Sequence, residues 1–126
     1  MLLVVDVGNT HITLGVFDGK DLKATFRMTA KQPRTSDEYG IQLCDLLVHR
    51  NFQVKDITDV IISSVVPDVM HSLGSAIIKY FGIKPMVPSN LDMGIAINTL
   101  YPKDVGPDRI VDAVAALEKY GAPCIV

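Results

Sequence analysis

Residues 6–10 combine side chains that could bind a phosphate group. Their sequence is Asp-Val-Gly-Asn-Thr, and it ends an apolar run that begins at Leu2. Because Gly8 has no Cβ, a turn there can approach a ligand closely, and successive turn amides form a concave anion site. Asp6 would be a buried charge unless a metal ion, water or a donor met it. The same residues are typical of an ordinary hairpin turn, so the pentapeptide alone leaves both interpretations open.

A second polar group, Gly106-Pro107-Asp108-Arg109, opens a helical pattern near the end of the chain. Proline presets the first helical turn, which places Asp108 and Arg109 at a helix N-terminus. An arginine beside the amides of a helix start suits a carboxylate ligand. The spacing alone equally allows Asp108 to stabilise the helix start while Arg109 lies in solvent.

Residues 63–67, Ser-Ser-Val-Val-Pro, join a predicted strand to a predicted helix. In α/β sheets such a junction is the usual place for a ligand crevice. The two serines are expected to shape a pocket rather than to react. A junction filled by Val65 and Val66 is the alternative. The cations Lys20, Lys23, Arg27 and Arg34 are interpreted as solvated surface residues.

The elements that must position these residues follow from apolar spacing and from turn and cap signals. An Asp18-Gly19 turn signal joins alternating runs into antiparallel strands. A capping box at residues 35–38 starts a helix, and Pro67 opens the next one. In chain order, the prediction is strands over residues 2–7, 11–17 and 21–29, a helix from 35 or 36, a strand over 59–66, a helix over 67–81, a short strand at 86–87, a loop over 88–105, a helix over 107–120 and a strand over 124–126.

This order, βββαβαβαβ, predicts an α/β fold of the ribonuclease H-like kind with a mixed sheet, as one domain over residues 1–126. The final apolar strand suggests a fragment, the N-terminal lobe of a protein about twice as long. The last helix is expected to turn four apolar side chains inward: Ile110, Val111, Val114 and Leu117.

Composition excludes several classes of protein. The chain has 126 residues, 48% of them hydrophobic, and a net charge of −2. Its twelve Lys and Arg are scattered, which argues against nucleic acid as a partner.

Cys44 and Cys124 are expected as buried side chains in a reducing compartment. The three histidines lie far apart, so a His/Cys metal site is not expected. No run reaches the length of a membrane span, and a cytoplasmic protein is expected.

Residues 6–10, 63–67 and 106–109, in this order and at these separations, resemble the type III pantothenate kinases. These enzymes belong to the acetate kinase/sugar kinase/Hsp70/actin superfamily, and the resemblance covers the whole chain. It implies one lobe of an actin-like ATPase fold, in which two lobes enclose a nucleotide cleft. It also implies an ATP-dependent transferase that phosphorylates the 4′-hydroxyl of pantothenate at the first step of coenzyme A biosynthesis. Because the nucleotide cleft lies between two lobes, one lobe alone is expected to be inactive. ATP, Mg²⁺, a monovalent cation (K⁺ or NH₄⁺) and a cytoplasmic homodimer are implied as well.

The resemblance also assigns roles to residues. Asp108 is the implied general base and Arg109 the anchor for the pantothenate carboxylate, while Asp6 faces the Mg²⁺ region. Tyr101 is a weaker substrate candidate, because it lies nearer to Gly106 than the family's tyrosine does. The implied ATP-binding residues are Asp6, Val7, Gly8, Asn9, Thr10, His11, Ile12 and Thr13, and the implied substrate-binding residues are Gly106, Pro107, Asp108 and Arg109.

Two other functions remain open at this point. One is a non-catalytic regulatory or accessory protein of the same family. Such a protein would have no need of Asp108 and Arg109, so the pair favours an enzyme. The other is a different small-molecule kinase of the superfamily, with a sugar or acetate as acceptor. That function would use residues 6–10 but would leave residues 106–109 unexplained.

Overall fold

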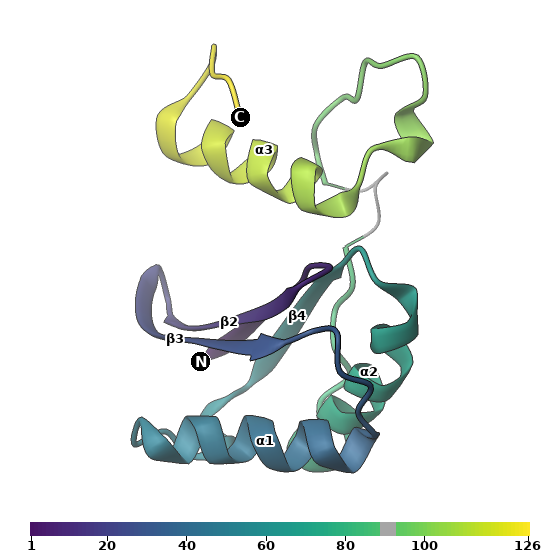
Figure 1. Cartoon of the computed structure of the whole chain (residues 1–126). Helices are drawn as coiled ribbons and strands as arrows, with labels where there is room; N and C mark the ends of the chain where they lie inside the picture. Colours follow the sequence, from purple (N-terminus) through teal and green to yellow (C-terminus); the bar gives the residue numbers. More distant parts are fainter. Residues whose placement is uncertain (89–92) are drawn as a thin grey trace. The chain divides into compact units, whose positions relative to one another are not determined.

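The computed structural model describes residues 1–88 and 93–126, and the chain divides into two compact units. Unit 1 (Met1–Val87) contains a four-stranded sheet and two α-helices, and the described residues of unit 2 (Pro88–Val126) contain one α-helix (Figure 1). The predicted α/β class is confirmed. That residues 1–126 form a single ribonuclease H-like lobe stays a prediction. Residues 89–92 of the predicted loop lie outside the described residues.

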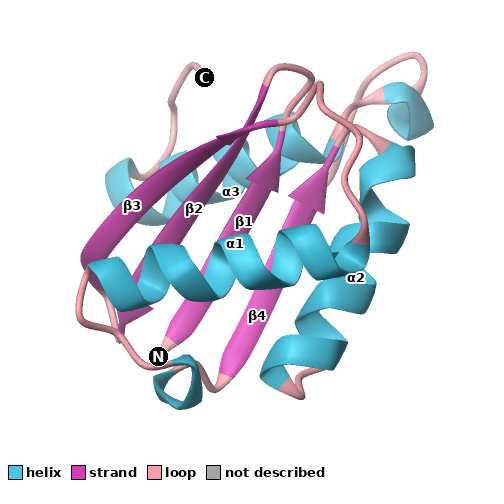
Figure 2. Ribbon diagram, turned by 60° about the horizontal axis from the view of Figure 1, so that its bottom comes forward, coloured by secondary structure: helices cyan, strands magenta, loops and turns pink. Residues whose placement is uncertain are grey.

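The sheet of unit 1 is mixed, with strand order β3-β2-β1-β4 (Figure 2). Strands β1, β2 and β3 form an antiparallel meander, and β4 adds parallel to β1. The parallel pair brings the carboxyl ends of β1 and β4 to the same edge. The bounds are β1 Leu2–Val7, β2 His11–Asp18, β3 Asp21–Thr29 and β4 Asp59–Ser64.

Two helices, α1 (Ser36–His49) and α2 (Pro67–Phe81), cover one face of this sheet (Figure 2). A short 3₁₀ turn, η1 (Val54–Asp56), leads into β4. Alternate residues of the strands point at the helices and form the core, because successive side chains in a strand point to opposite faces. Fully buried members of the core include Leu3, Val5, Val7, Ile12, Leu14, Val16, Ile62, Leu73 and Ile77.

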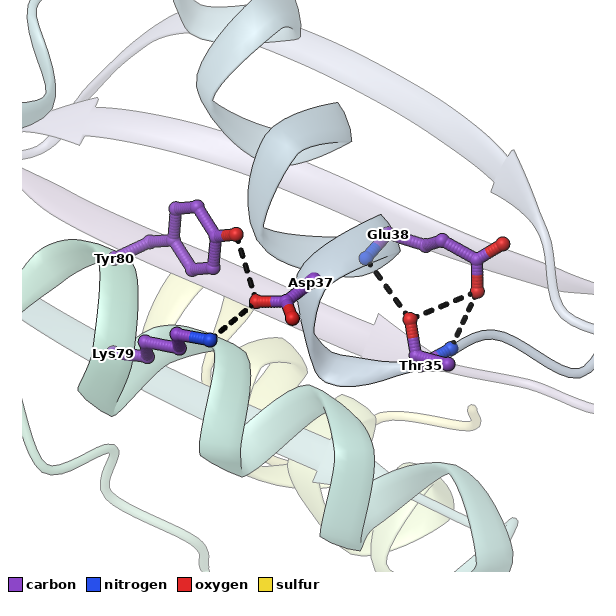
Figure 3. Close-up of polar contacts among 5 residues, drawn as sticks. All are labelled: Thr35, Asp37, Glu38, Lys79 and Tyr80. Carbon is purple, nitrogen blue, oxygen red and sulfur yellow. Dashed lines mark hydrogen bonds and ion pairs between the residues drawn. The ribbon is translucent and has the colours of Figure 1, made fainter.

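The start of α1 confirms the predicted capping box (Figure 3). The amide of Glu38 donates to the Thr35 hydroxyl at 3.3 Å, and the Thr35 amide donates to the Glu38 carboxylate at 2.7 Å. The latter bond favours the charged carboxylate and therefore lowers the pKa of Glu38. The cap fixes where α1 begins.

A polar contact joins the first turn of α1 to the last turn of α2 (Figure 3). Lys79 Nζ lies 2.6 Å from Asp37 Oδ1, and the Tyr80 hydroxyl donates to the same oxygen at 2.8 Å. The hydrogen bond from Lys79, followed by that from Tyr80, lowers the pKa of Asp37. Beside it, the Tyr80 ring occupies the space that a side chain on Gly40 would need. Gly40 therefore allows α1 and α2 to pack closely.

Unit 2 contains a 3₁₀ turn, η2 (Pro102–Asp104), and the helix α3 (Pro107–Tyr120). The predicted bounds of α3 are confirmed. Of its four predicted inward residues, Ile110 is 2% exposed, Val111 and Val114 are half-buried, and Leu117 is 43% exposed. The prediction for Leu117 is wrong.

The two strands predicted after α2 are not formed as predicted. Residues 86–87 contribute a single parallel bridge between Met86 and Ile61. Residues 124–126 are exposed and form no strand within the described residues. A strand needs a neighbour for its N–H and C=O groups, and apolar character does not specify one.

The predicted burial of the cysteines is also wrong in part. Cys124 is exposed and Cys44 is half-buried. Burial, followed by the nearby charge of Asp45, raises the pKa of the Cys44 thiol. Across residues 1–88 and 93–126, no helix is both long and apolar enough to cross a bilayer.

Candidate functional site

The turn at residues 8–10 joins β1 to β2 and is a tight hairpin. The Gly8 amide donates to the His11 carbonyl at 2.9 Å. A Cβ on Gly8 would lie 3.3 Å from that carbonyl oxygen, so glycine permits the close approach. The Ala30 amide donates to the Thr10 carbonyl at 2.9 Å, which ties the turn to the end of β3. The turn is held on both sides, and the Gly8 amide is used within it.

The donors that this turn can offer to an anion are therefore those of its tip. Asn9, Thr10 and His11 are exposed. In the part of the chain that the structure describes, the amides of Asn9 and Thr10 make no hydrogen bond. A hairpin and a phosphate site are thus compatible here, because the hairpin uses one amide and leaves two at its tip.

Asp6 lies one residue inside the end of β1, on the sheet face opposite α1 and α2. Its side chain is exposed, so it is not an isolated charge in the core. In the sheet register it faces Thr13 on β2 and Ser63 on β4. This register places a carboxylate between two hydroxyl side chains in one row across three strands.

Two of the predicted ATP-binding residues point away from this row. Val7 and Ile12 are paired across β1 and β2, and both are fully buried in the core under the helices. Their side chains hold the sheet together, and only their backbone lies near the turn. Thr13 is half-buried beside Asp6.

The junction at residues 63–67 begins α2 by a local hydrogen-bond pattern. The Ser64 hydroxyl accepts from the Val66 amide at 3.0 Å and donates to the Val66 carbonyl at 3.1 Å. The Val65 amide donates to the Val7 carbonyl at 3.1 Å. Pro67 then takes the first helical position. This is why β4 ends at Ser64, two residues earlier than predicted: the Ser64 hydroxyl offers the backbone an alternative to the strand.

A cavity of about 380 Å³ in unit 1 lies beside the turn, between the β3–α1 loop and the start of α2. Asn9, Lys31, Arg34 and Asp68 contribute polar groups to its wall. Arg34 donates to the Thr29 carbonyl at 2.6 Å and its guanidinium carbon lies 5.7 Å from the centre of the Tyr39 ring. It is half-buried by these contacts, so it is only partly solvated.

In unit 2, the residues predicted to bind substrate lie at the start of α3. Gly106 caps the helix with extended backbone, and Pro107 occupies its first turn. Asp108 follows in that turn and is half-buried, and Arg109 is exposed. The N-terminal amides of a helix favour negative charge nearby, which suits both the Asp108 carboxylate and an anionic ligand.

A pocket of about 600 Å³ opens next to this helix start. Tyr101, Gly106 and Arg109, three of the predicted substrate residues, line it. Sequence reasoning missed its other lining residues, because they lie in and around the η2 turn, where the backbone is irregular and has no periodic pattern. These are Thr99, Leu100, Asp104 and Val105.

The side chains around Asp6 in unit 1 suit a magnesium ion better than a metal that needs three or more protein ligands. In residues 1–88 and 93–126, no three His, Cys, Asp or Glu side chains come together as metal ligands. Mg²⁺ does not need such a cage, because it binds through one or two carboxylates, several waters and substrate phosphates. The Asp6 carboxylate beside two hydroxyls is a donor set of that kind.

The fold and these residues define a class of protein. A four-stranded mixed sheet with a polar turn at its edge is consistent with the N-terminal lobe of an actin-like ATPase. The sequence model of type III pantothenate kinase matches residues 2–126, and the chain therefore belongs to the type III pantothenate kinase family.

One curated relative extends this result. A type III pantothenate kinase of Agathobacter rectalis is 56% identical over 127 residues, an alignment that covers 100% of this chain and 49% of the relative. The chain spans about half the length of the curated relative it matches.

Proposed function

We propose that this chain is the N-terminal half of an enzyme that phosphorylates pantothenate with ATP. The product would be 4′-phosphopantothenate, and the reaction would open coenzyme A biosynthesis. Family membership supports the reaction. The pocket lined by Tyr101, Gly106 and Arg109 is the observation that favours this acceptor, since pantothenate has a carboxylate at one end that Arg109 could bind.

In this proposal, unit 1 binds the phosphates of ATP. The exposed tip of the hairpin, with Asn9 and Thr10, offers amides and short polar side chains to phosphate oxygens. His11 begins β2 beside them, and Thr13 lies next to Asp6 in the sheet. Gly8 contributes by its shape, because it lets the turn close on the His11 carbonyl.

Asp6 is the residue that would hold Mg²⁺, through water or directly. An ion held by Asp6 would supply positive charge against the negative charge that develops on the phosphates during phosphoryl transfer. Asp6 is one position from the end of β1 and exposed, so it can reach such an ion without being buried as an isolated charge.

Unit 2 would bind the acceptor. Asp108 would accept the proton of the pantothenate hydroxyl, and phosphoryl transfer depends on this positioning more than on early deprotonation. Arg109 would pair with the pantothenate carboxylate in the pocket that it lines. Gly106 and Pro107 set the helix start, and Tyr101 forms another part of the pocket wall.

The family supports three finer proposals. The enzyme would use a monovalent cation, K⁺ or NH₄⁺, in addition to Mg²⁺. It would act as a homodimer, and it would be cytoplasmic. These proposals rest on membership of the type III pantothenate kinase family.

Product analysis of the full-length protein tests the reaction. With ATP, Mg²⁺ and pantothenate, mass spectrometry should detect phosphopantothenate, in an amount equal to the ADP formed. Acetate and a hexose serve as control acceptors and should give no phosphorylated product. ATP consumption without phosphopantothenate, or phosphorylation of acetate or the hexose instead, would contradict the proposal.

A further inference from the structure

Ser63 is a buried polar residue whose hydroxyl has no partner. It keeps 9% of its surface exposed. Among the described residues, its Oγ is the buried side-chain oxygen for which the structure contains no hydrogen bond. A buried hydroxyl without a partner loses its hydrogen bonds to water and gains none in return, so such a group calls for an explanation.

The neighbouring serine shows that the local backbone could have satisfied a hydroxyl. Ser64 both accepts from the Val66 amide and donates to the Val66 carbonyl. Ser64 lies in register with Val7, on the helix-covered face of the sheet. Ser63 points to the other face, where the strand alternation puts it in the row of Asp6 and Thr13.

The register partner of Ser63 in this row is Asp6, whose carboxylate can accept a hydrogen bond. Asp6 and Ser63 are direct partners in the parallel β1–β4 pair, and parallel strands lie about 4.8 Å apart. Side chains of adjacent partners on one face are within reach of each other. On its far side, β4 is bridged by Met86, whose backbone bonds Val60 and Ile62. On that side, the backbone groups of Met86 are therefore already hydrogen-bonded to β4.

We propose that Ser63 is a positioning residue for Asp6: its hydroxyl donates a hydrogen bond to one carboxylate oxygen of Asp6 when nucleotide and metal are bound. The other oxygen then holds the metal or its water. This inference rests on the role proposed above for Asp6. In the ligand-free protein the Ser63 hydroxyl has no partner, and its hydrogen bond to Asp6 forms when nucleotide and metal bind.

The proposal predicts opposite effects of one substitution in two states. In Ser63→Ala, the ligand-free protein loses a hydroxyl that had no partner, so its unfolding temperature should be unchanged or raised. Metal binding should weaken about tenfold, the lower end of what the loss of a hydrogen-bond partner of a metal ligand costs. A serine that merely stabilises the fold would lower the unfolding temperature and leave metal binding intact.

The experiment uses the full-length protein with Mn²⁺ as the metal and ADP as the nucleotide. The dissociation constant of Mn²⁺ is measured by electron paramagnetic resonance for the wild type, Ser63→Ala, Asp6→Asn and the double variant. Ser75→Ala, a serine to alanine change on α2, is the matched control and should leave Mn²⁺ binding unchanged. Thermal unfolding of each ligand-free variant is recorded alongside.

The expected result is that Ser63→Ala weakens Mn²⁺ binding in the wild type and has no further effect in Asp6→Asn. An equal loss in both backgrounds, no loss at all, or a lower ligand-free unfolding temperature would overturn the role of Ser63. If Asp6→Asn binds Mn²⁺ as the wild type does, the proposed function of Asp6 fails and the role of Ser63 fails with it. A loss in Asp6→Asn without one in Ser63→Ala removes the inference about Ser63 alone.

Discussion

The two units of the chain differ in how they hold the residues assigned to chemistry. In unit 1, a core of strand and helix residues lies directly under the hairpin that contains Gly8 and Asn9. In unit 2, Ile110 is the single hydrophobic side chain that is buried among its described residues. Other apolar side chains of unit 2 are exposed: Leu100, Tyr101, Leu117, Tyr120, Ile125 and Val126.

This difference bears on how each half of the proposed reaction would be organised. The hairpin is pinned by backbone bonds to His11 and Ala30, so its geometry is set before a ligand arrives. The start of α3 has few buried contacts around it, and segments of that kind open locally at a lower free-energy cost. We therefore expect the phosphate side to be rigid and the acceptor side to become ordered when its ligand binds.

The largest effect is expected from Asp108→Asn in the full-length enzyme. Turnover should fall by roughly 10²-fold or more, the usual range for a lost general base, while the fold is kept. Steady-state rates with saturating ATP and pantothenate measure this. A fall of less than about threefold would mean that Asp108 is not the base.

Among the substitutions in unit 1 that affect the fold, Gly40→Ala should lower the free energy of unfolding most. A Cβ at this position collides with the Tyr80 ring, and overpacking of this kind costs about 1–3 kcal/mol. Gly74→Ala on α2 is the matched control, because a Cβ there meets nothing within 4 Å. It should stabilise the helix by about 0.5–1 kcal/mol. Urea unfolding of both variants decides the point, and equal effects would show that the α1–α2 contact does not limit stability.

Arg109→Ala should raise the KM for pantothenate about tenfold, which corresponds to about 1.4 kcal/mol. The kcat should fall by less, because a carboxylate anchor far from the reacting hydroxyl binds ground state and transition state alike. Steady-state kinetics separate the two constants. An unchanged KM with a collapsed kcat would make Arg109 a phosphate stabiliser instead.

The smallest effect is expected from Asp37→Asn, which removes the carboxylate that Lys79 and Tyr80 share. The folded-state pKa of Asp37 is lowered, so its contribution is present above the unfolded pKa of about 3.9 and disappears as pH falls through the folded value. The variant should unfold at a slightly lower temperature than the wild type at pH 7, and the gap should close in strong acid. Thermal unfolding from pH 2 to 8 measures this, and a gap that persists at pH 2 would point to lost packing.

The sequence predicted those parts of the fold that have a local cause. The capping box at Thr35 and the proline at position 67 correctly predicted where α1 and α2 begin. The end of β4 was placed too late, because its valines continue an apolar run while the Ser64 hydroxyl turns the backbone. The terminal strand was predicted from apolar character alone, and pairing partners are not encoded locally.

The same holds for the candidate sites: residues in local motifs could be predicted, and contacts that depend on the folded structure could not. Residues 6–10 and 106–109 stand at element ends, where a sequence motif identifies them. The orphaned hydroxyl of Ser63 depends on how β4 packs in the sheet, and the contact of Arg34 with Tyr39 depends on how the loop before α1 folds against that helix. The lining residues Thr99 and Asp104 belong to irregular backbone, so no periodicity points to them.

The central claim is a division of labour, in which Asp6 of unit 1 serves the nucleotide and Arg109 of unit 2 serves the acceptor. Calorimetric titration of the full-length protein tests it, with pantothenate alone and with ADP plus Mg²⁺, on Asp6→Asn and Arg109→Ala. The account predicts that Arg109→Ala weakens pantothenate binding about tenfold and leaves nucleotide binding unchanged, and that Asp6→Asn does the reverse. If Asp6→Asn weakened pantothenate binding as much as Arg109→Ala does, the division of labour would be contradicted.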